Sequence, residues 1–504
     1  MSSPSLSLPP PIRTGVAGLD IILAGGLTPH RLYLLEGVPG SGKTTMAMQF
    51  LMAGVAAGER VLYVTLSETE RELREVAHAH GWSLDGIAIH ELFPVGDQLD
   101  PESQYTMFHP SEIELVETTR RVLDEVERQQ PDRVVFDSLA ELRLLAGSML
   151  RFRRQVLALK QYFAGKGTTV LMLDESQVSD QGLHVHTIVH GAIQLDHQTL
   201  DFGGDRRRLR ISKMRGRAFR SGYHDYKIET GGVRAYPRLI AADYRRHGEN
   251  VPVASDLAEL DLLLGGGLDR GTSTLLIGAA GAGKSSLASH FVRSAAARGE
   301  RSALFLFDES QRAMVTRSKG IGFDVERCID EGTVDLQSID PAELSAGEFI
   351  ERIRTAVEVD NAKLIVIDSL NGFLNAMAEE HHVLIQLHEL LSYLAQLDIT
   401  TILIASQAGL IGHMQTSLDV SYLADTVVLL RYFESRGEVK QAISVLKKRT
   451  GPHERTIREM RITSQGLQIG EPLRHFRGVL TGVPQEEPPN DLTVSEPTPT
   501  GDAE

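Results

Sequence analysis

The sequence has almost no cysteine: Cys328 is the single one among 504 residues. One thiol can form neither an intramolecular disulfide nor a zinc site built from cysteines, so we expect a reducing compartment. Long apolar runs are also missing, since none approaches the ~20 residues that a membrane-spanning helix needs. Residues 1–11 are rich in Ser and Pro and lack the apolar core of a signal peptide. We therefore expect a cytoplasmic protein without a membrane segment.

The chain also lacks an excess of positive charge. Its 52 Lys and Arg residues are outnumbered by 67 Asp and Glu residues, which gives a net charge of −15. Proteins that bind nucleic acid usually carry a basic face, so this balance argues against a nucleic-acid partner. The hydrophobic content of 42% is enough to fill sizeable cores, and the length suits two or three domains.

One stretch carries a specific motif. Gly278 to Ser285 reads Gly-Ala-Ala-Gly-Ala-Gly-Lys-Ser and fits the phosphate-binding loop G-x-x-x-x-G-K-[ST]. The apolar run 274–277 predicts a strand before it, and residues 286–294 predict a helix after it. In that setting backbone N–H groups surround phosphate oxygens, and the helix N-terminus adds positive charge. Lys284 would contact the β- and γ-phosphates of ATP, and the Ser285 hydroxyl would bind Mg²⁺.

The same motif occurs earlier, at Gly37 to Thr44, between a predicted strand at 32–35 and a helix that begins near Thr45. The two motif lysines are 284 − 43 = 241 positions apart, and the segments that lead into the loops match at the same offset. A repeat of this length indicates a duplicated domain, because solenoid units are only about 20–50 residues long. The sequence thus predicts two P-loop domains in tandem.

Each loop supplies a set of predicted ATP contacts. The first set is Gly37, Pro39, Gly40, Ser41, Gly42, Lys43, Thr44 and Thr45, and the second is Gly278, Gly281, Ala282, Gly283, Lys284, Ser285 and Ser286.

Two apolar strands end in an aspartate. Asp137 ends the predicted strand at 132–138, and Asp368 ends the one at 363–367. Such an acid holds Mg²⁺ directly or through water, so we predict metal sites made by Thr44 with Asp137 and by Ser285 with Asp368. The alternative is that the aspartate caps the helix that follows.

Further carboxylates follow another strand in each repeat. They are Glu68 in the first repeat, and Asp308 and Glu309 in the second. The carboxyl ends of parallel strands are where α/β sheets bind ligands, so we predict that these acids orient or deprotonate the attacking nucleophile, with Glu309 as the principal one. The alternative is an N-cap role. Because water and a Ser hydroxyl can use the same groups, hydrolysis and autophosphorylation both remain open.

Two further segments are rich in histidine or arginine. His184 and His186 are two positions apart, which would place them on one face of a strand near His190 and His197, although no Cys or paired acid completes a metal site. The arginine-rich run 206–215 would be a nucleic-acid patch, a solvated strand face or a subunit contact.

The order of these features resembles the KaiC-like branch of the RecA-type ATPases. The resemblance covers roughly residues 12–475 and is most specific in the runs 421–426, 436–438 and 447–449. It implies an α/β fold with two tandem RecA-like P-loop domains, each a mostly parallel sheet flanked by helices. We expect domains at 12–240 and 254–475, a linker at 241–253, and disordered ends at 1–11 and 476–504.

The resemblance also implies a homohexameric ring with ATP and Mg²⁺ at subunit interfaces, and regulatory partners such as a KaiB-like protein or a signalling kinase. Lys213 with Arg215, and Lys447 with Arg449, match the pair that reaches the phosphates of the neighbouring subunit. Ser421 matches a phosphorylated serine; the alternative is a buried or capping hydroxyl.

The sequence departs from this pattern in several places. Tyr422 stands where the family's clock protein has a phosphorylated threonine, and Ser67 replaces the first acid of the pair in the first domain. His190 stands where the second domain has Asp425. We therefore expect the first domain to bind ATP well but to hydrolyse it slowly.

Three functions compete on these grounds. The favoured one is a ring ATPase that is also a serine autokinase and phosphatase and acts as a signalling or timing switch. The others are an ATP-dependent assembly module without autokinase activity and a RecA-type DNA-dependent ATPase.

Overall fold

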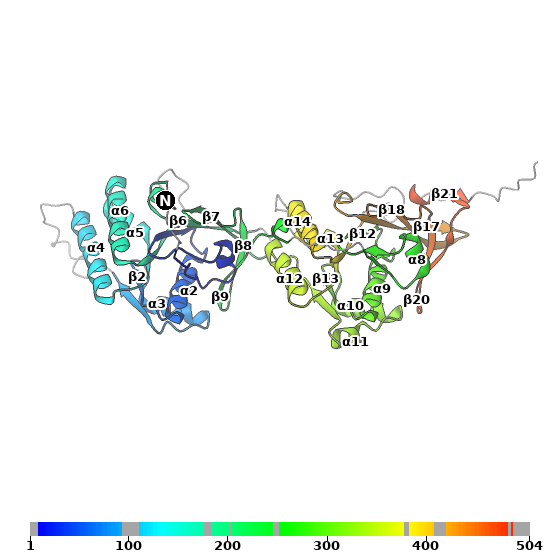
Figure 1. The fold of residues 1–504 in the computed structure, drawn as a ribbon, viewed down its shortest axis with the longest axis horizontal. Helices are drawn as coiled ribbons and strands as arrows, with labels where there is room; N and C mark the ends of the chain where they lie inside the picture. The colour runs from blue at the N-terminus through cyan, green and yellow to red at the C-terminus, as the bar shows by residue number, and fades with distance from the viewer. Residues whose placement is uncertain are drawn as a thin grey trace, which may run out of the picture. The chain divides into compact units, whose positions relative to one another are not determined.

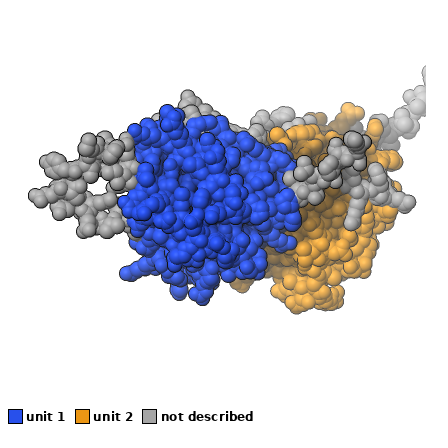
Figure 2. Space-filling model, turned by 60° about the vertical axis from the view of Figure 1, so that its left-hand side comes forward, with its two compact units in different colours: residues 1–238, 345–351 blue, residues 239–344, 352–504 orange. Residues whose placement is uncertain are grey.

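The computed structural model describes residues 9–92, 110–175, 183–200, 203–244, 251–376, 383–407, 420–481 and 485–486. The chain divides into two compact units (Figure 2): unit 1 comprises residues 1–238 with 345–351, and unit 2 comprises 239–344 with 352–504. Most of the predicted N-terminal segment, 1–8, and most of the predicted tail, 487–504, lie outside the described residues.

Unit 1 forms the blue-to-green part of the ribbon in Figure 1. It is built on one nine-stranded sheet with the order β3-β2-β4-β5-β1-β6-β7-β8-β9. The strand β1 pairs in parallel with both β5 and β6, whereas β6 to β9 follow one another antiparallel. The strands are β1 (Leu32–Gly37), β2 (Val61–Thr65), β3 (Ile87–Glu91), β4 (Arg133–Asp137), β5 (Thr169–Glu175), β6 (Gly191–Gln198), β7 (Arg206–Met214), β8 (His224–Glu229) and β9 (Gly232–Tyr236).

Helices cover both faces of this sheet because successive strand residues alternate in direction. Tyr33 and Leu35 join the core under α2 and α3, whereas Leu32 and Leu34 join the core under α4 to α7. The helices are α1 (Leu19–Ile22), α2 (Lys43–Ala56), α3 (Glu70–Ala79), α4 (Pro110–Gln129), α5 (Leu139–Ala146), α6 (Met149–Lys166) and α7 (Leu183–Ile188).

Unit 2 repeats the strand order, as β14-β13-β15-β16-β12-β17-β18-β19-β20, so the predicted fold class is confirmed. Its nine main strands are β12 (Ser273–Gly278), β13 (Ser302–Leu306), β14 (Val334–Ser338), β15 (Leu364–Asp368), β16 (Thr400–Ser406), β17 (Thr426–Ser435), β18 (Glu438–Lys448), β19 (Arg458–Thr463) and β20 (Gly466–Pro472). Its helices are α8 (Ala258–Leu263), α9 (Lys284–Ala297), α10 (Gln311–Gly320), α11 (Val325–Asp330), α12 (Ala346–Glu358, of which the part up to residue 351 is grouped with unit 1), α13 (Leu370–Ala376) and α14 (Val383–Gln396).

Short elements lie in the predicted linker and in the first part of the predicted tail. The linker region contains η4 (Ala241–Asp243) and β10 (Pro252–Val253), which pairs with β11 (Leu268–Asp269). The tail begins with β21 (Phe476–Arg477), η5 (Val479–Thr481) and β22 (Gln485–Glu486), and Val479 packs against Phe433.

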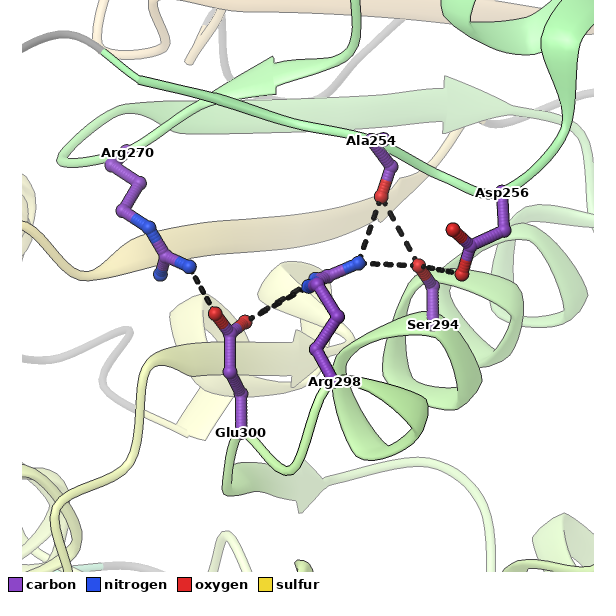
Figure 3. Close-up of polar contacts among 6 residues, drawn as sticks. All are labelled: Ala254, Asp256, Arg270, Ser294, Arg298 and Glu300. Atoms are coloured by element: carbon purple, nitrogen blue, oxygen red, sulfur yellow. Dashed lines mark hydrogen bonds and ion pairs between the residues drawn. The ribbon is translucent and has the colours of Figure 1, made fainter.

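A polar network fastens the entry segment of unit 2 to the end of the P-loop helix α9 (Figure 3). Arg298 Nη1 donates to the carbonyl of Ala254 at 3.0 Å and to Ser294 Oγ at 2.6 Å. Glu300 accepts from Arg298 at 3.2 Å and also pairs with Arg270. These polar contacts hold the segment before the P-loop strand against the end of α9.

Unit 1 makes the equivalent connection with a different arginine. Arg133, the first residue of β4, pairs with Glu59 and donates from Nη1 to the carbonyl of Arg13 at 2.7 Å. At the offset of 241, Arg13 corresponds to Ala254 and Glu59 to Glu300. Yet Arg133 corresponds by strand register to Leu364, because it pairs with Val61 as Leu364 pairs with Ser302. Each unit therefore anchors its entry segment with an arginine, but the arginine comes from a different position of the repeat.

The prediction that His184 and His186 lie on one strand face is wrong. Both belong to the helix α7, in which a spacing of two residues turns side chains about 200° apart. His186 Nε2 instead contacts Glu36 Oε2 at 2.9 Å. Among the described residues, no group of three or more His, Cys, Asp or Glu is arranged to hold a metal ion.

Candidate ATP sites

The two P-loops have the same backbone form. Gly42 and Gly283, which precede the motif lysines, have φ of 89° and 96°, a region that favours glycine. A Cβ at Gly42 would lie 2.7 Å from Ile228, and one at Gly283 would lie 2.8 Å from Met460. The positive φ therefore favours glycine at both positions, and a Cβ there would also crowd side chains of β8 or β19.

The motif lysines begin the helices α2 and α9 and fold back over the loops. Lys43 Nζ donates to the carbonyls of Gly37 and Val38 at 2.8 and 3.1 Å. Lys284 Nζ donates to the two equivalent carbonyls at 3.0 and 2.7 Å. Burial lowers the pKa of both ammonium groups, and nearby carboxylates partly oppose this by raising it. Each lysine is thus a cation held by backbone dipoles at the centre of its loop, and Lys284 is buried whereas Lys43 is half-buried.

The aspartate at the end of β4 is nearly enclosed. Burial raises the pKa of Asp137, whereas hydrogen bonds from Tyr63 and Thr44 and the charge of Lys43 lower it. The Tyr63 hydroxyl donates to Asp137 Oδ2 at 2.6 Å. The N-cap of α5 is Ser138, so Asp137 does not cap that helix.

The aspartate at the end of β15 has a similar environment. Burial raises the pKa of Asp368, and a hydrogen bond from the Ser285 hydroxyl lowers it. In unit 2 the position of Tyr63 is taken by Leu304, since 63 + 241 = 304, so no phenol supports Asp368 from that strand. Both units nevertheless bring a P-loop hydroxyl to a strand-end carboxylate.

These groups fit ATP with Mg²⁺. A hydroxyl beside a carboxylate is a typical oxygen donor set for Mg²⁺ in nucleotide sites. The buried Ser41 Oγ in the first loop has no hydrogen-bond partner in the structure. The lysine, hydroxyl and carboxylate predicted for each site therefore come together in space.

The predicted catalytic carboxylates of unit 2 lie between β13 and α10. Asp308 accepts a hydrogen bond from the Ser369 hydroxyl. Glu309 forms an ion pair with Arg317, in which Nη2 lies 2.7 Å from Oε2. The N-cap of α10 is Ser310, so neither acid caps the helix.

The predicted carboxylate of unit 1 has a different environment. Glu68 Oε2 is buried and has no hydrogen-bond partner in the structure. Burial raises the pKa of Glu68, the charge of Asp137 raises it further, and Lys43 lowers it. Thr69 is the N-cap of α3 and forms a capping box with Glu72, so Glu68 is not needed as a cap.

The Lys-x-Arg pairs contact backbone carbonyls of their own unit. Lys447 Nζ donates to the carbonyls of Ser421 and Ala424 at 2.9 and 2.7 Å, and Arg449 Nη2 donates to that of Tyr422 at 2.7 Å. In unit 1, Lys213 and Arg215 likewise donate to the carbonyls of residues 186 and 187. Each pair thus binds the segment that precedes the inner strand β6 or β17.

The phosphorylation candidate lies in that segment. Ser421 is half-buried, whereas Tyr422 beside it is 53% exposed. The backbone carbonyls of Ser421 and of the residues that follow it are therefore held by Lys447 and Arg449.

Sequence reasoning missed three partners of these groups. Tyr63 supports Asp137, Arg317 pairs with Glu309, and His186 contacts Glu36 next to the first loop. Arg317 could have been found from the sequence by comparing the repeats. At the offset of 241, the equivalent residue of unit 1 is Val76, so an arginine occurs at this position in unit 2 only.

The chain is similar to known proteins over most of its length. The family model described as "ATPase: KaiC" matches residues 12–240 and 253–474. A circadian clock oscillator protein KaiC of Synechococcus elongatus is 28% identical over 492 residues, which cover 96% of this chain and 93% of the relative. A circadian clock protein KaiC3 of Synechocystis is 27% identical over 482 residues, 94% of each chain. None of the described helices has the length and apolar character that a bilayer crossing needs.

Proposed function

The chain belongs to the KaiC family of ATPases, and on that basis we propose that both units bind ATP with Mg²⁺ and that unit 2 transfers the γ-phosphoryl group to water and to Ser421. One observation carries the proposal: in each unit a P-loop lysine, a P-loop hydroxyl and a strand-end aspartate come together. This is the set that phosphoryl transfer requires.

Each group has a role in this proposal. When bound, ATP supplies the phosphoryl group, and Mg²⁺ neutralises charge on its phosphates. Lys43 and Lys284 bind the phosphates, and Asp137 and Asp368 hold the metal ion with the neighbouring hydroxyls of Thr44 and Ser285. Glu309 orients the nucleophile and accepts its proton, because a carboxylate at the end of β13 faces the phosphate side of the sheet.

We also propose that the protein forms a homohexameric ring and acts as a switch read by other proteins. Lys447 and Arg449 would then exchange their carbonyl contacts for phosphates of the neighbouring subunit, and Lys213 and Arg215 would do the same in unit 1. Light scattering with and without ATP tests the ring, since a hexamer that forms only with ATP supports interfacial sites.

The chemistry is tested with ATP labelled on the γ-phosphate. The protein and its Lys43→Ala, Lys284→Ala and Ser421→Ala variants are incubated with Mg²⁺, and label released to solvent is compared with label retained on protein. Retained label that disappears with Lys284→Ala and with Ser421→Ala supports the autokinase. Released phosphate with unlabelled protein would support an ATPase without autokinase activity. If no label is released and none is retained on the protein, both proposed activities are contradicted.

A further inference from the structure

A cation of unit 2 holds the proposed catalytic carboxylate by both of its oxygens. Arg317, in the last turn of α10, donates from Nη2 to Glu309 Oε2 at 2.7 Å and from Nε to Oε1 at 3.3 Å. The two side chains are 25% and 26% exposed, so water screens this pair less than an ion pair on the open surface. The planar guanidinium fork fixes the orientation of a carboxylate in a way that a single donor does not.

The same guanidinium connects Glu309 to the P-loop helix. Arg317 Nη1 donates to Ser289 Oγ at 3.3 Å, and that hydroxyl donates to the carbonyl of Ser285 at 2.8 Å. The charge of Arg317 also lowers the pKa of Asp368. Arg317 therefore joins the proposed base to the P-loop helix through Ser289, and its charge also acts on the aspartate of the second site.

Unit 1 has none of this support. At the offset of 241, Val76 takes the place of Arg317 and Met48 that of Ser289. The corresponding carboxylate, Glu68, keeps a buried oxygen without a hydrogen-bond partner. The helices α3 and α10 share the same boundaries at this offset, so the difference lies in the side chains.

We propose that Arg317 is a positioning residue that fixes Glu309 over the P-loop helix and so sets the turnover of the second site. The inference rests on the proposed function of Glu309. A carboxylate held at both oxygens enters the reaction with one orientation, whereas one that rotates freely spends time in unproductive geometries.

The test uses the full chain with unit 1 disabled by Lys43→Ala. In this background we expect Arg317→Val, which installs the residue of unit 1, to lower kcat for phosphate release by about tenfold or more. KM, and the affinity for a fluorescent non-hydrolysable ATP analogue, should stay within about twofold, because Arg317 acts through Glu309 rather than on the nucleotide. Arg317→Lys should restore part of the rate. Arg312→Val, at an exposed arginine of the same helix, is the matched control and should change nothing.

A double-mutant cycle separates positioning from general stability. Adding Arg317→Val to Glu309→Gln should cost little beyond Glu309→Gln alone, because the arginine has lost the group it positions. An unchanged kcat in Arg317→Val, additive losses in the cycle, or a loss of analogue affinity would each overturn the inference. Failure of the proposed function looks different: the Lys43→Ala protein would then release no more phosphate than the Lys43→Ala/Lys284→Ala double variant.

Discussion

The phenolic hydroxyl of Tyr63 donates a hydrogen bond of 2.6 Å to Asp137 Oδ2, inside the sheet of unit 1. Burial and the charge of Asp137 raise the pKa of Tyr63, so the phenol stays protonated and remains a donor. Since the same hydrogen bond lowers the pKa of Asp137, the tyrosine favours the ionised carboxylate that a metal ion needs.

We expect Tyr63→Phe to destabilise unit 1 by about 1.5–3 kcal/mol, the range for a hydrogen bond to a charged group. It should also weaken Mg²⁺-dependent nucleotide binding in a Lys284→Ala background. The effect should be strongest at low pH, because loss of the hydrogen bond raises the pKa of Asp137 and its carboxylate is then protonated more readily. Urea unfolding and titration with a fluorescent ATP analogue measure the two effects. Tyr33→Phe is the control, because that buried hydroxyl donates only to a neutral carbonyl, at 2.9 Å. Equal losses in both variants would contradict a special role for Asp137.

Nucleotide binding in unit 1 should depend more on Mg²⁺ than binding in unit 2. Four carboxylates act on the charge of Lys43, those of Glu175, Asp137, Asp174 and Glu68, whereas Asp368 alone acts on Lys284. Without Mg²⁺, the additional carboxylates of unit 1 repel the phosphates of ATP. We expect this repulsion to cost about 1.4 kcal/mol, or about tenfold in affinity.

This difference is measured by chelating Mg²⁺ with EDTA during analogue titrations. Lys284→Ala reports unit 1, and Lys43→Ala reports unit 2. Glu175→Gln should reduce the sensitivity of unit 1, and equal sensitivity of the two units would show that the extra carboxylates are neutralised by their own partners.

Replacing the two anchoring arginines, Arg133 and Arg298, by alanine should lower the free energy of unfolding by different amounts. Arg133 is 3% exposed in its side chain, and Arg133→Ala would leave Glu59 and the carbonyls of Arg13 and Phe50 without their cation. We expect a loss of about 3–5 kcal/mol, as for a broken buried ion pair. Arg298 is 30% exposed, so Arg298→Ala should cost only about 1 kcal/mol. Urea unfolding of both variants checks the order, and a larger loss for Arg298→Ala would reverse the argument.

His224 makes the stability of unit 1 depend on pH. The backbone N–H of Arg238 donates to its Nδ1 at 2.8 Å, so Nε2 carries the proton that is donated to the carbonyl of Arg220 at 2.9 Å. Burial lowers the pKa of His224 from 6.5 to about 4. Between these pH values the unfolded chain binds a proton at His224 that the folded chain does not bind. The contribution of His224 to the free energy of unfolding is therefore fully present above about pH 6.5 and is lost as the pH falls towards 4.

The expected loss from this group is about 3 kcal/mol between pH 7 and pH 4. His224→Gln keeps a donor and an acceptor but cannot titrate, so its unfolding free energy should vary less with pH. His78→Gln, at an exposed position of α3, should keep the wild-type slope. A His224→Gln profile parallel to wild type would disprove the assignment.

Local motifs made much of this architecture predictable. The P-loops, the strand-end residues Asp137 and Asp368 and the repeated strand order follow from short patterns whose chemistry depends on neighbours in sequence. The partners of these groups did not follow. Tyr63 is 74 positions from Asp137 in the chain, and Arg317 meets Glu309 only because α10 turns back over the strand end.

The short helix α7 shows a different limit. Its histidines at two-residue spacing matched a strand pattern, but the segment is six residues long and its buried members, Val185 and Ile188, are three positions apart. Packing of that pair against the sheet stabilises the helical conformation. In the sequence, a segment of six residues has less than two helical turns, which is too short for the helical period to be recognised.

The different arginines that anchor the two entry segments also limit how the halves of this gene can recombine. Transplanting α2 and the residue that follows it into unit 2 would bring Ala57 in place of Arg298 beside Leu364, and the segment would lose its anchor. Transplanting α9 with Arg298 into unit 1 would place a second guanidinium beside Arg133, and both would compete for Glu59. An exchange of these segments between the repeats should therefore destabilise either unit, so the duplicated halves are not interchangeable at this point.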